Sequence, residues 1–415
     1  MPPIEGARPP SEETATASDD RGTTTVLGRE TYLAFGTPNF SDEEVAEVTR
    51  VLRSGWVGMG PEVLAFEQEL AAYVGAPEVV SVSSCTAALF LALLTEGIGP
   101  GDEVVVPSLT WCATANAALY LGATPVFCDL DPASFCPTPE TVLAAVTPRT
   151  RAVIVVHYGG LAIDVAALRA ALPPEIALIE DAAHALGGRY PDGRPVGSSG
   201  NPVCFSFYAN KNLSTAEGGA IVLSDPDRAE RLRSLRMSGY RSDAWARYIR
   251  PGNLGGGQVS ELGYKMNYTD LQAAIGRVQL RRLDRMQAHR AALVARYLDR
   301  LRARGLALPF QRGVGEDRHA HHLLVCLIDS TQTGHDRGTV LRELRRRNYG
   351  ASVHYAPLHR QDLYADGWRT PLPVTDHLAE QILTLPISAS MALTDVDGVV
   401  DTLADILRQS GAPHD

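Results

Sequence analysis

The chain lacks any run of about eighteen apolar residues, the length that a membrane-spanning helix needs. Its start, Met1 to Glu5, also lacks the apolar core of a signal peptide. We therefore expect a cytoplasmic protein without a membrane segment. The formal net charge of −10 argues against a nucleic-acid-binding surface, so no nucleic acid is expected as a partner.

Cysteine is infrequent, and lysine is rarer still. The six cysteines show no Cys-x-x-Cys spacing, which argues against a zinc ribbon or a redox pair. His319, His321 and His322 lie close together, but they precede a strand pattern, and we expect no metal site there. Lysine occurs only at Lys211 and Lys265, whereas arginine and alanine are abundant. This composition is typical of a GC-rich genome, and it suggests a role in secondary metabolism as a hypothesis.

The remaining composition is that of an ordinary globular protein, with 45% apolar and 21% charged residues. A chain of 415 residues usually forms two domains. Residues 1–25 are rich in Pro, Ser, Thr, Glu and Asp and poor in large apolar side chains. Because such a segment cannot offset the entropy lost on ordering, we predict a disordered N-terminal tail.

Short apolar segments recur regularly after the first helical patterns, and each is followed by a turn or a segment of helical period. They lie at Val79–Val82, Glu103–Val106, Pro125–Cys128, Ala152–Val156, Ala177–Ile179, Val203–Phe207 and Ala220–Leu223. The pattern is typical of βαβ units, and the continuous hydrophobicity indicates helices on both faces of a mostly parallel sheet.

We therefore predict an α/β fold in two parts. The larger domain, residues 26–285, contains N-terminal helices and a mostly parallel seven-stranded sheet. A long helical pattern over Leu271–Leu301 leads into a smaller C-terminal α+β domain, residues 286–415. The Gly-Gly-Gly at 255–257 is interpreted as a mobile loop.

Lys211 follows a short apolar strand and precedes a Gly-Gly turn. A lysine in such a place can have a lowered pKa, so that its amine forms a Schiff base with an aldehyde. Asp181, about thirty residues upstream at the end of another apolar segment, provides the acid partner that a pyridinium nitrogen needs. Each residue alone is more simply a surface lysine or a helix-capping aspartate, but the pair indicates a pyridoxal phosphate (PLP) site.

Two further strand ends fit the same ligand, because ligands of open α/β sheets bind beyond the carboxyl ends of the strands. Ser83 to Leu89 opens a helix with small and hydroxylic residues, which suits a phosphate, although a plain N-cap is the favoured explanation of this motif taken alone. Trp111 follows the next strand, where an indole can stack on a flat ring or belong to the core.

These motifs resemble the DegT-type (DegT/DnrJ/StrS) family of PLP-dependent sugar aminotransferases, a branch of the fold-type I, aspartate-aminotransferase-like enzymes. The resemblance extends from about Thr31 to Leu407. The matching stretches include Gly55-Trp56, Pro107 to Trp111, Val156-His157-Tyr158-Gly159-Gly160, Glu180 to His184, the Lys211 motif, Gly263 to Asp270, Pro357-Leu358-His359 and Leu385-Pro386.

The resemblance implies a role for each cofactor residue. Lys211 would form the Schiff base, Asp181 would keep the pyridine nitrogen protonated, and His184 would hydrogen-bond the ring oxygen. Trp111 would stack on the ring. The phosphate would be held by Ser206 and by backbone groups of Cys85 and Thr86, with Asn267 reaching the cofactor of a partner subunit in a homodimer with shared sites. Cys85 stands where many relatives carry Gly or Ala, which backbone binding of the phosphate tolerates.

The resemblance also implies the reaction: L-glutamate donates its amino group to a nucleotide-linked keto sugar in a ping-pong mechanism through the pyridoxamine form. The Gly-Tyr-Lys-x-Asn motif around Lys265, together with Trp111, resembles family members that act at sugar carbon 4, which favours a 4-keto-6-deoxyhexose. Substrate contacts are predicted by position at Trp56, Tyr240, Lys265, His354 and His359, and for the two histidines a structural role at a domain junction is equally good. The alternatives are a sugar dehydratase of the same fold, against which Lys211 argues because those relatives carry histidine there, and a non-catalytic regulator.

Overall fold

The computed structural model describes residues 28–240, 258–364 and 371–408. Its main feature is a seven-stranded sheet with the order β1-β7-β6-β5-β4-β2-β3. The strands are β1 (Glu78–Val82), β2 (Glu103–Pro107), β3 (Thr124–Cys128), β4 (Thr150–Val156), β5 (Ala177–Asp181), β6 (Val203–Ser206) and β7 (Gly219–Leu223). β7 runs antiparallel to both neighbours and the other pairings are parallel, so the predicted α/β fold with a mostly parallel seven-stranded sheet is confirmed.

Alternate residues of each strand enter separate apolar cores on the two faces of the sheet. In β1, for example, Val79 belongs to one core, and Val80 and Val82 belong to the other. This follows from the period of two along a strand. Helices cover both faces, as the continuous hydrophobicity predicted.

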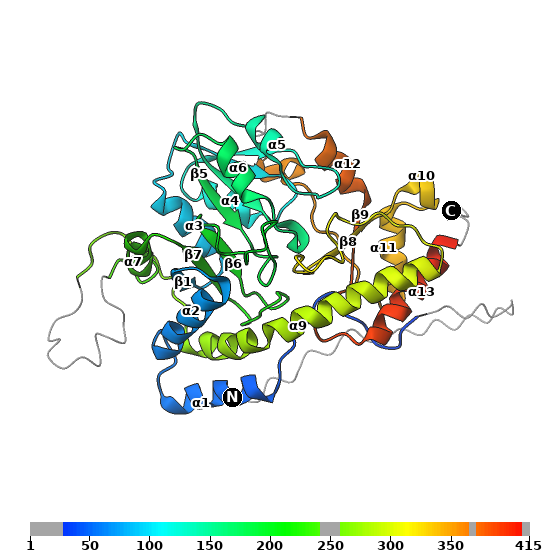
Figure 1. Cartoon of the computed structure of the whole chain (residues 1–415), viewed down its shortest axis with the longest axis horizontal. Coiled ribbons are helices and arrows are strands. Elements are labelled where there is room, and N and C mark those ends of the chain that lie inside the picture. Colours follow the sequence, from blue (N-terminus) through cyan, green and yellow to red (C-terminus); the bar gives the residue numbers. More distant parts are fainter. Residues whose placement is uncertain (1–27, 241–257, 365–370, 409–415) are drawn as a thin grey trace, which may run out of the picture.

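One face is covered by α3 (Cys85–Thr95), α4 (Ala113–Leu119) and α7 (Pro226–Leu235). The other is covered by α2 (Pro61–Val74), α5 (Pro139–Leu143), α6 (Val165–Ala171) and the first half of α9 (Asp270–Ala303). Figure 1 shows these helices around the sheet, with α1 (Asp42–Ser54) lying outside α9.

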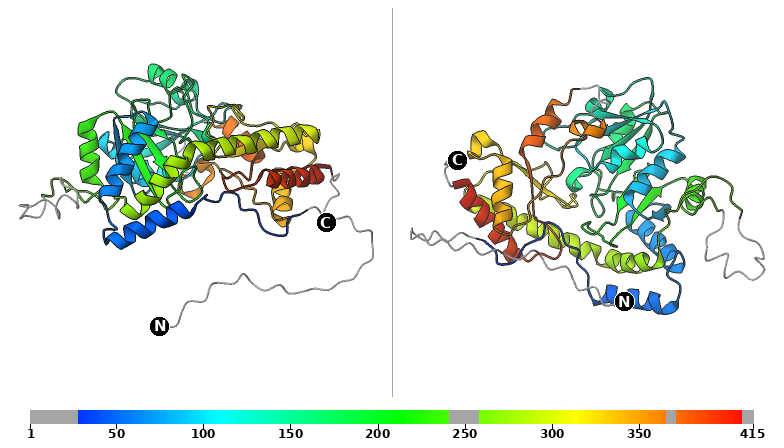
Figure 2. Two further views of the ribbon diagram at one scale, coloured as in Figure 1. Left: turned by 60° about the horizontal axis from the view of Figure 1, so that its bottom comes forward. Right: turned by 180° about the vertical axis from the view of Figure 1, so that it is seen from behind.

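The long helix α9 joins this sheet to a third apolar core. Its first half packs under the sheet through Leu283, whereas Leu293 and Tyr297 pack with the C-terminal elements. Its 34 residues correspond to about 50 Å of helix. Both views in Figure 2 show α9 running from the sheet to α13 (Leu393–Arg408).

The third core contains β8 (Leu324–Leu327), β9 (Ile382–Leu385), α11 (Arg337–Arg346) and α13, with β8 and β9 forming an antiparallel two-stranded sheet. The remaining short elements are η1 (Tyr158–Gly160), α10 (Ser330–Thr333), η2 (Leu358–Arg360), η3 (Asp362–Tyr364) and α12 (Pro373–Gln381). The predicted disordered tail and the Gly-Gly-Gly loop lie outside the described residues. No helix in the described part of the chain has the length and apolar character needed to cross a membrane.

Candidate active site

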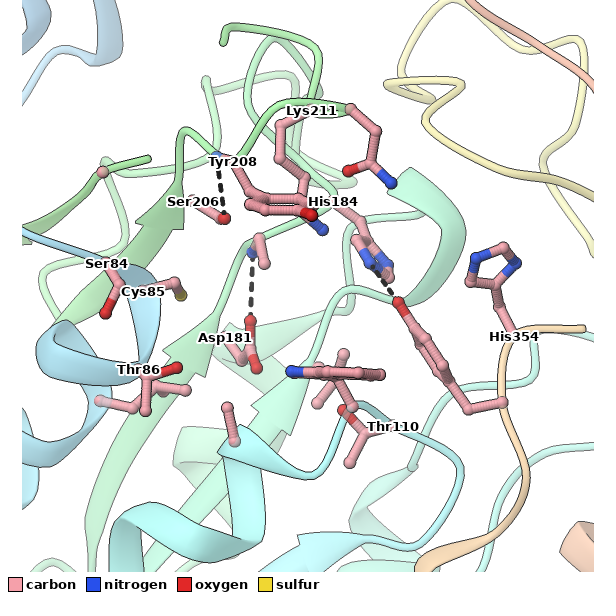
Figure 3. Close-up of a pocket in the computed structure, with 18 of the residues that line it drawn as sticks. Ser84, Cys85, Thr86, Thr110, Asp181, His184, Ser206, Tyr208, Lys211 and His354 are labelled. Carbon is pink, nitrogen blue, oxygen red and sulfur yellow. Dashed lines mark hydrogen bonds between the residues drawn. The ribbon is translucent and has the colours of Figure 1, made fainter. Parts of the chain in front are cut away.

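A cavity of about 440 Å³ opens at the carboxyl ends of the parallel strands. Its size lies in the usual range for small-ligand sites. Eight of the residues predicted from the sequence line it, together with residues that the sequence did not indicate (Figure 3). The predicted ones are Cys85, Thr86, Trp111, Asp181, His184, Ser206, Lys211 and His354.

Asp181 is the last residue of β5 and its side chain is buried. Oδ2 accepts a hydrogen bond from Thr114 Oγ1 at 2.8 Å, and Oδ1 accepts one from the backbone N–H of Ala183 at 3.1 Å. Burial raises the pKa of Asp181, while the two hydrogen bonds and the nearby Lys211 oppose that rise. The carboxylate is therefore fixed in orientation and supported as an anion, which suits it to hold a proton on a ring nitrogen.

Lys211 lies in the turn that follows β6, where its backbone N–H bonds to the carbonyl of Tyr208 at 2.9 Å. The side chain points into the cavity and is only partly exposed. Loss of solvent lowers the pKa of the Lys211 amine to about 8, although Asp181 and Cys85 favour its charged form. A useful fraction of the amine is therefore neutral near pH 7–8, as a Schiff-base nucleophile requires.

His184 lies between a backbone donor and a phenol. The N–H of Gly159 donates to Nδ1 at 3.3 Å, and Nε2 lies 3.1 Å from the hydroxyl of Tyr355. Burial and the charge of Lys211 lower the pKa of His184 well below its ordinary value. Because Nδ1 accepts and the ring is neutral, Nε2 carries the hydrogen and can donate it to an oxygen in the cavity.

The start of α3 forms an anion-binding wall of the cavity. Ser84 caps the helix by accepting from Ala87 N at 3.1 Å, and the N–H groups of Cys85 and Thr86 have no acceptor within the helix. Gly219 lies so close that a Cβ atom there would stand 2.5 Å from the Ser84 carbonyl carbon. The free N–H groups and the helix dipole favour a phosphate here.

Trp111 is 60% exposed and lines the cavity, so the interpretation as a core tryptophan is wrong. Its ring centroid lies 5.9 Å from that of Tyr355. In the loop after β2, Leu109 is buried in the core and Trp111 lines the cavity. The indole is free to cover a flat ring.

Four other predicted residues lie away from this cavity. Trp56 donates its Nε1–H to the carbonyl of Met59 at 3.2 Å, and Tyr240 forms an isolated bridge with Val259. Lys265 is exposed beside an adjacent surface hollow that includes Ser84 and Thr86, and Asn267 lies in the same segment, bridged to Val82.

His359 is also outside the cavity, unlike His354. It is buried, with Nδ1 2.7 Å from Ser108 Oγ and Nε2 3.1 Å from Asp376 Oδ1. Of the two equal interpretations of this histidine, the structure favours the structural one, because both ring nitrogens are engaged by protein groups.

The sequence did not indicate Thr114, Tyr355 or Tyr208. Thr110 Oγ1 lies 2.9 Å from Thr114 Oγ1, which makes a hydroxyl chain leading to Asp181. The available signal was the spacing of these threonines, with Thr110 in the loop after β2 and Thr114 in the first turn of α4. Tyr355 adjoins His354, but nothing local identifies it because it meets His184 across 171 positions.

The cavity therefore offers what PLP needs. It provides a nucleophilic amine, a carboxylate fixed beside it, a neutral imidazole N–H donor, a helix start for the phosphate and an open indole. In the described part of the chain no three His, Cys, Asp or Glu side chains gather as a metal site.

Comparisons with known proteins agree with this chemistry. Residues 38–404 match the DegT/DnrJ/EryC1/StrS aminotransferase family. A spore coat polysaccharide biosynthesis protein, SpsC, from Bacillus subtilis (strain 168) is 42% identical over 389 residues, which cover 92% of this chain and 99% of that protein.

Two solved structures are similar throughout. The putative sugar aminotransferase Spr1654 from Streptococcus pneumoniae, in its pyridoxamine phosphate (PMP) form, has a TM-score of 0.84 and 28% identity, covering 91% of this chain and all of that one. DesI, solved in the presence of its TDP-sugar product, has a TM-score of 0.82 and 30% identity, covering 93% and 95%. These relatives favour the aminotransferase over the dehydratase and the regulator. The chain belongs to the DegT/DnrJ/EryC1/StrS aminotransferase family and is a PLP-dependent sugar aminotransferase.

Proposed function

We propose that the protein transfers the amino group of L-glutamate to a nucleotide-linked keto sugar, of the 4-keto-6-deoxyhexose class, in ping-pong order through the pyridoxamine form. The observation that carries the proposal is the Lys211 amine, with its pKa of about 8, in one cavity with the anchored carboxylate of Asp181. When bound, PLP supplies an electron sink for the pair released by the broken Cα–H bond.

Asp181, His184 and Lys211 each have a separate role in the proposed reaction. Asp181 holds a proton on the ring nitrogen, and its bond from Thr114 keeps the carboxylate in line. His184, whose Nε2 lies 3.1 Å from the Tyr355 hydroxyl, would donate Nε2–H to the ring oxygen of the bound cofactor. The amine of Lys211 would move the proton from the substrate Cα as a general base of suitable pKa.

The phosphate is assigned to the start of α3. Backbone N–H groups of Cys85 and Thr86 face it, and Ser206 at the end of β6 adds a hydroxyl. The thiol of Cys85 is directed to the carbonyl of Cys204, at 3.7 Å, and so away from competition for the phosphate. Burial raises the pKa of this thiol well above its ordinary value, which keeps it uncharged beside an anion.

The acceptor is assigned to the mouth of the cavity, where Trp111 and His354 stand. The TDP-sugar product of DesI supports a nucleotide-linked sugar as the class of acceptor. We propose further that two copies of the chain share their sites, with Asn267 and Lys265 serving the partner. The adjacent surface hollow, lined by Phe90, exposed Tyr120, Tyr264 and Met266 among others, has the apolar character of a subunit contact.

The first experiment is an absorption spectrum of the purified protein with PLP, before and after L-glutamate. We expect a yellow band that glutamate bleaches, and no such band in Lys211→Ala. Lys265→Ala is the matched control because Lys265 is the only other lysine, and it should keep the band. Borohydride reduction followed by peptide mapping should locate the cofactor on Lys211; a label on Lys265, or an absent band in the wild type, would refute the proposal.

A second experiment identifies the acceptor. The glutamate-treated enzyme is offered nucleotide-linked 4-keto and 3-keto sugars, and the products are weighed by mass spectrometry. An amino sugar formed only from the 4-keto class supports the assignment. Loss of water without gain of an amine would instead support a dehydratase.

The shared site has its own test. Light scattering should give a dimer at micromolar concentration, and Asn267→Ala should weaken PLP binding while the dimer persists. A monomer that is fully active would exclude the shared-site arrangement.

A further inference from the structure

Residues 319–323 form a buried segment, here called the histidine strap, that carries His319, His321 and His322. Two of these rings serve the fold of the strap itself. Nδ1 of His319 accepts from the N–H of His321 at 2.9 Å, and Nε2 of His321 accepts from the N–H of Gly315 at 3.2 Å. His322 is different because its contacts are with the candidate active site.

His322 contacts two residues that adjoin the cofactor position. Its ring centroid lies 4.5 Å from that of His184, with 31° between the planes. Its Nδ1 lies 3.1 Å from Oδ1 of Asn212, the buried residue directly after Lys211. A single side chain therefore touches both His184 and the neighbour of the catalytic lysine.

The direction of the His322 hydrogen bond follows from its partner. Asn212 Nδ2 donates to the carbonyl of Ala320 at 2.7 Å and to Gln287 Oε1 at 3.1 Å, so Oδ1 is the acceptor and His322 Nδ1 carries the hydrogen. Burial, together with the nearby charges of Lys211 and Arg290, lowers the pKa of His322 well below its ordinary value. The ring is therefore a neutral hydrogen-bond donor near pH 7.

The backbone of the strap is also linked to His184, through hydrogen bonds to the turn that holds the His184 ring. Ala320 N donates to Gly160 O at 2.9 Å and Leu323 N to Gly159 O at 3.0 Å, while Gly159 N donates to His184 Nδ1. Gly160 has φ +111°, and a Cβ there would lie 3.0 Å from the backbone N of His321, so only glycine permits this approach. The strap thus joins the turn after β4 to the turn after β6.

We propose that His322 is a positioning residue for the aminotransferase reaction. Its hydrogen bond to Asn212 and its ring contact with His184 hold the Lys211 turn and the His184 imidazole in a fixed relation around the bound cofactor. The inference rests on the proposed roles of Lys211 and His184. Its consequence is that the strap, which touches no substrate, sets how strongly His184 donates to the cofactor's ring oxygen.

Three variants separate the two contacts. His322→Phe keeps a ring beside His184 but leaves Asn212 Oδ1 without its donor. His322→Asn keeps a donor near the Nδ1 position but removes the ring. Asn212→Ala removes the acceptor of the hydrogen bond. If this bond is what positions the site, adding Asn212→Ala to His322→Phe should change the measured values little beyond those of His322→Phe alone.

The measurement is the pH titration of the visible absorption of the holoenzyme, together with kcat and KM. The negative charge on the cofactor's ring oxygen stabilises the protonated form of the Lys211 nitrogen, and a hydrogen-bond donor to that oxygen weakens this effect. A misplaced His184 should therefore raise the midpoint of the titration, which is the pH at which half of the Lys211 nitrogen is protonated. We expect His322→Phe to raise it by about one pH unit. The same variant should lower kcat about tenfold with KM changed less than about twofold. His322→Asn should recover part of both effects.

The control is His319→Phe, which damages the strap at an equally buried histidine without touching His184 or Asn212. It should lower the melting temperature and leave the midpoint unchanged. An equal midpoint shift in His319→Phe, or an unshifted midpoint in folded His322→Phe, would overturn the proposal. If His322→Phe does not fold, the midpoint of Asn212→Ala decides in its place. The wild-type band and its bleaching by glutamate report separately on the proposed function, so the two failures are distinguishable.

Discussion

Thr114 donates its hydroxyl to Oδ2 of Asp181 at 2.8 Å, across 67 positions of sequence. This bond, with the one from Ala183 N, opposes the rise in pKa that burial imposes on the carboxyl group. The hydroxyl of Thr110 stands 2.9 Å behind that of Thr114 and completes the chain. Two threonines on the loop and helix after β2 therefore support the anion at the end of β5.

Thr114→Val should leave the fold intact and weaken the Asp181 anion. Because a hydrogen bond to a charged group contributes about 1.5–3 kcal/mol, we expect kcat to fall at least about tenfold. Thr110→Val, one step further from the carboxylate, should have a smaller effect. Steady-state kinetics with glutamate and a keto sugar measure both, and equal kcat values in wild type and Thr114→Val would contradict this role.

Lys211 should make the apoprotein less stable near neutral pH. Its pKa is about 8 in the folded protein against 10.5 ordinarily, so the unfolded chain binds the proton more tightly. The free energy of unfolding therefore gains a contribution that rises between about pH 8 and 10.5, and below pH 8 the full cost of about 3 kcal/mol applies.

Lys211→Met should remove that cost. Urea denaturation of the apoprotein at pH 7 should give a more stable variant, and the difference from wild type should shrink towards pH 10.5. Exposed Lys265→Met is the control and should follow the wild-type curve. A constant difference across this range would mean that the pKa of Lys211 is not lowered.

Gly219→Ala should weaken phosphate binding. A Cβ atom would stand 2.5 Å from the Ser84 carbonyl carbon and 2.6 Å from Cys85 N, and it would push the start of α3 aside. Overpacking of this kind costs about 1–3 kcal/mol, so we expect PLP affinity to fall about tenfold. Binding of pyridoxal, which has no phosphate, should fall less.

Gly99→Ala provides the matched comparison, because no atom lies within 4 Å of its added Cβ. It should bind PLP as the wild type does. Fluorescence titration of the apoproteins gives all of these affinities. Equal losses for PLP and pyridoxal in Gly219→Ala would indicate general damage instead of a phosphate effect.

His354 and His359 should behave differently on replacement by alanine. His354 lines the cavity and its Nδ1 lies 3.0 Å from Thr384 Oγ1, so its loss should raise KM for the sugar substrate as its main effect, with a smaller loss of stability. His359 is held by Ser108 and Asp376, so its loss should reduce the free energy of unfolding by about 1–3 kcal/mol and leave KM within about twofold. Kinetics and thermal melts of the two variants would contradict this division if they gave the same profile.

Much of the architecture could be predicted because its signals are local. Each of the seven strands was visible as a short, mostly apolar segment, since a strand covered on both faces buries side chains of both orientations. The carboxyl ends of parallel strands meet at one edge, which is why Asp181 and Ser206 could be expected near Lys211. The helix at 271–301 was likewise predicted from its period, and it extends over Asp270–Ala303.

Other parts of the site had no local signal. Tyr355 reaches His184 from 171 positions away, Thr114 reaches Asp181 from 67, and His322 reaches Asn212 from 110. Neither the exposure of Trp111 nor the burial of His359 between Ser108 and Asp376 follows from the residues around them. These contacts and exposures depend on how separate helices, strands and loops pack against one another.

The sequence by itself determined the α/β sheet and the residue types that collect at its carboxyl edge, because strand periodicity and strand-end chemistry are written in consecutive residues. Only the tertiary structure decided which groups support that chemistry. The orientation of Asp181 by Thr114, the protonated nitrogen of His184 and the contact of His322 with Asn212 all require side chains from distant segments to approach within hydrogen-bonding or ring-contact distance.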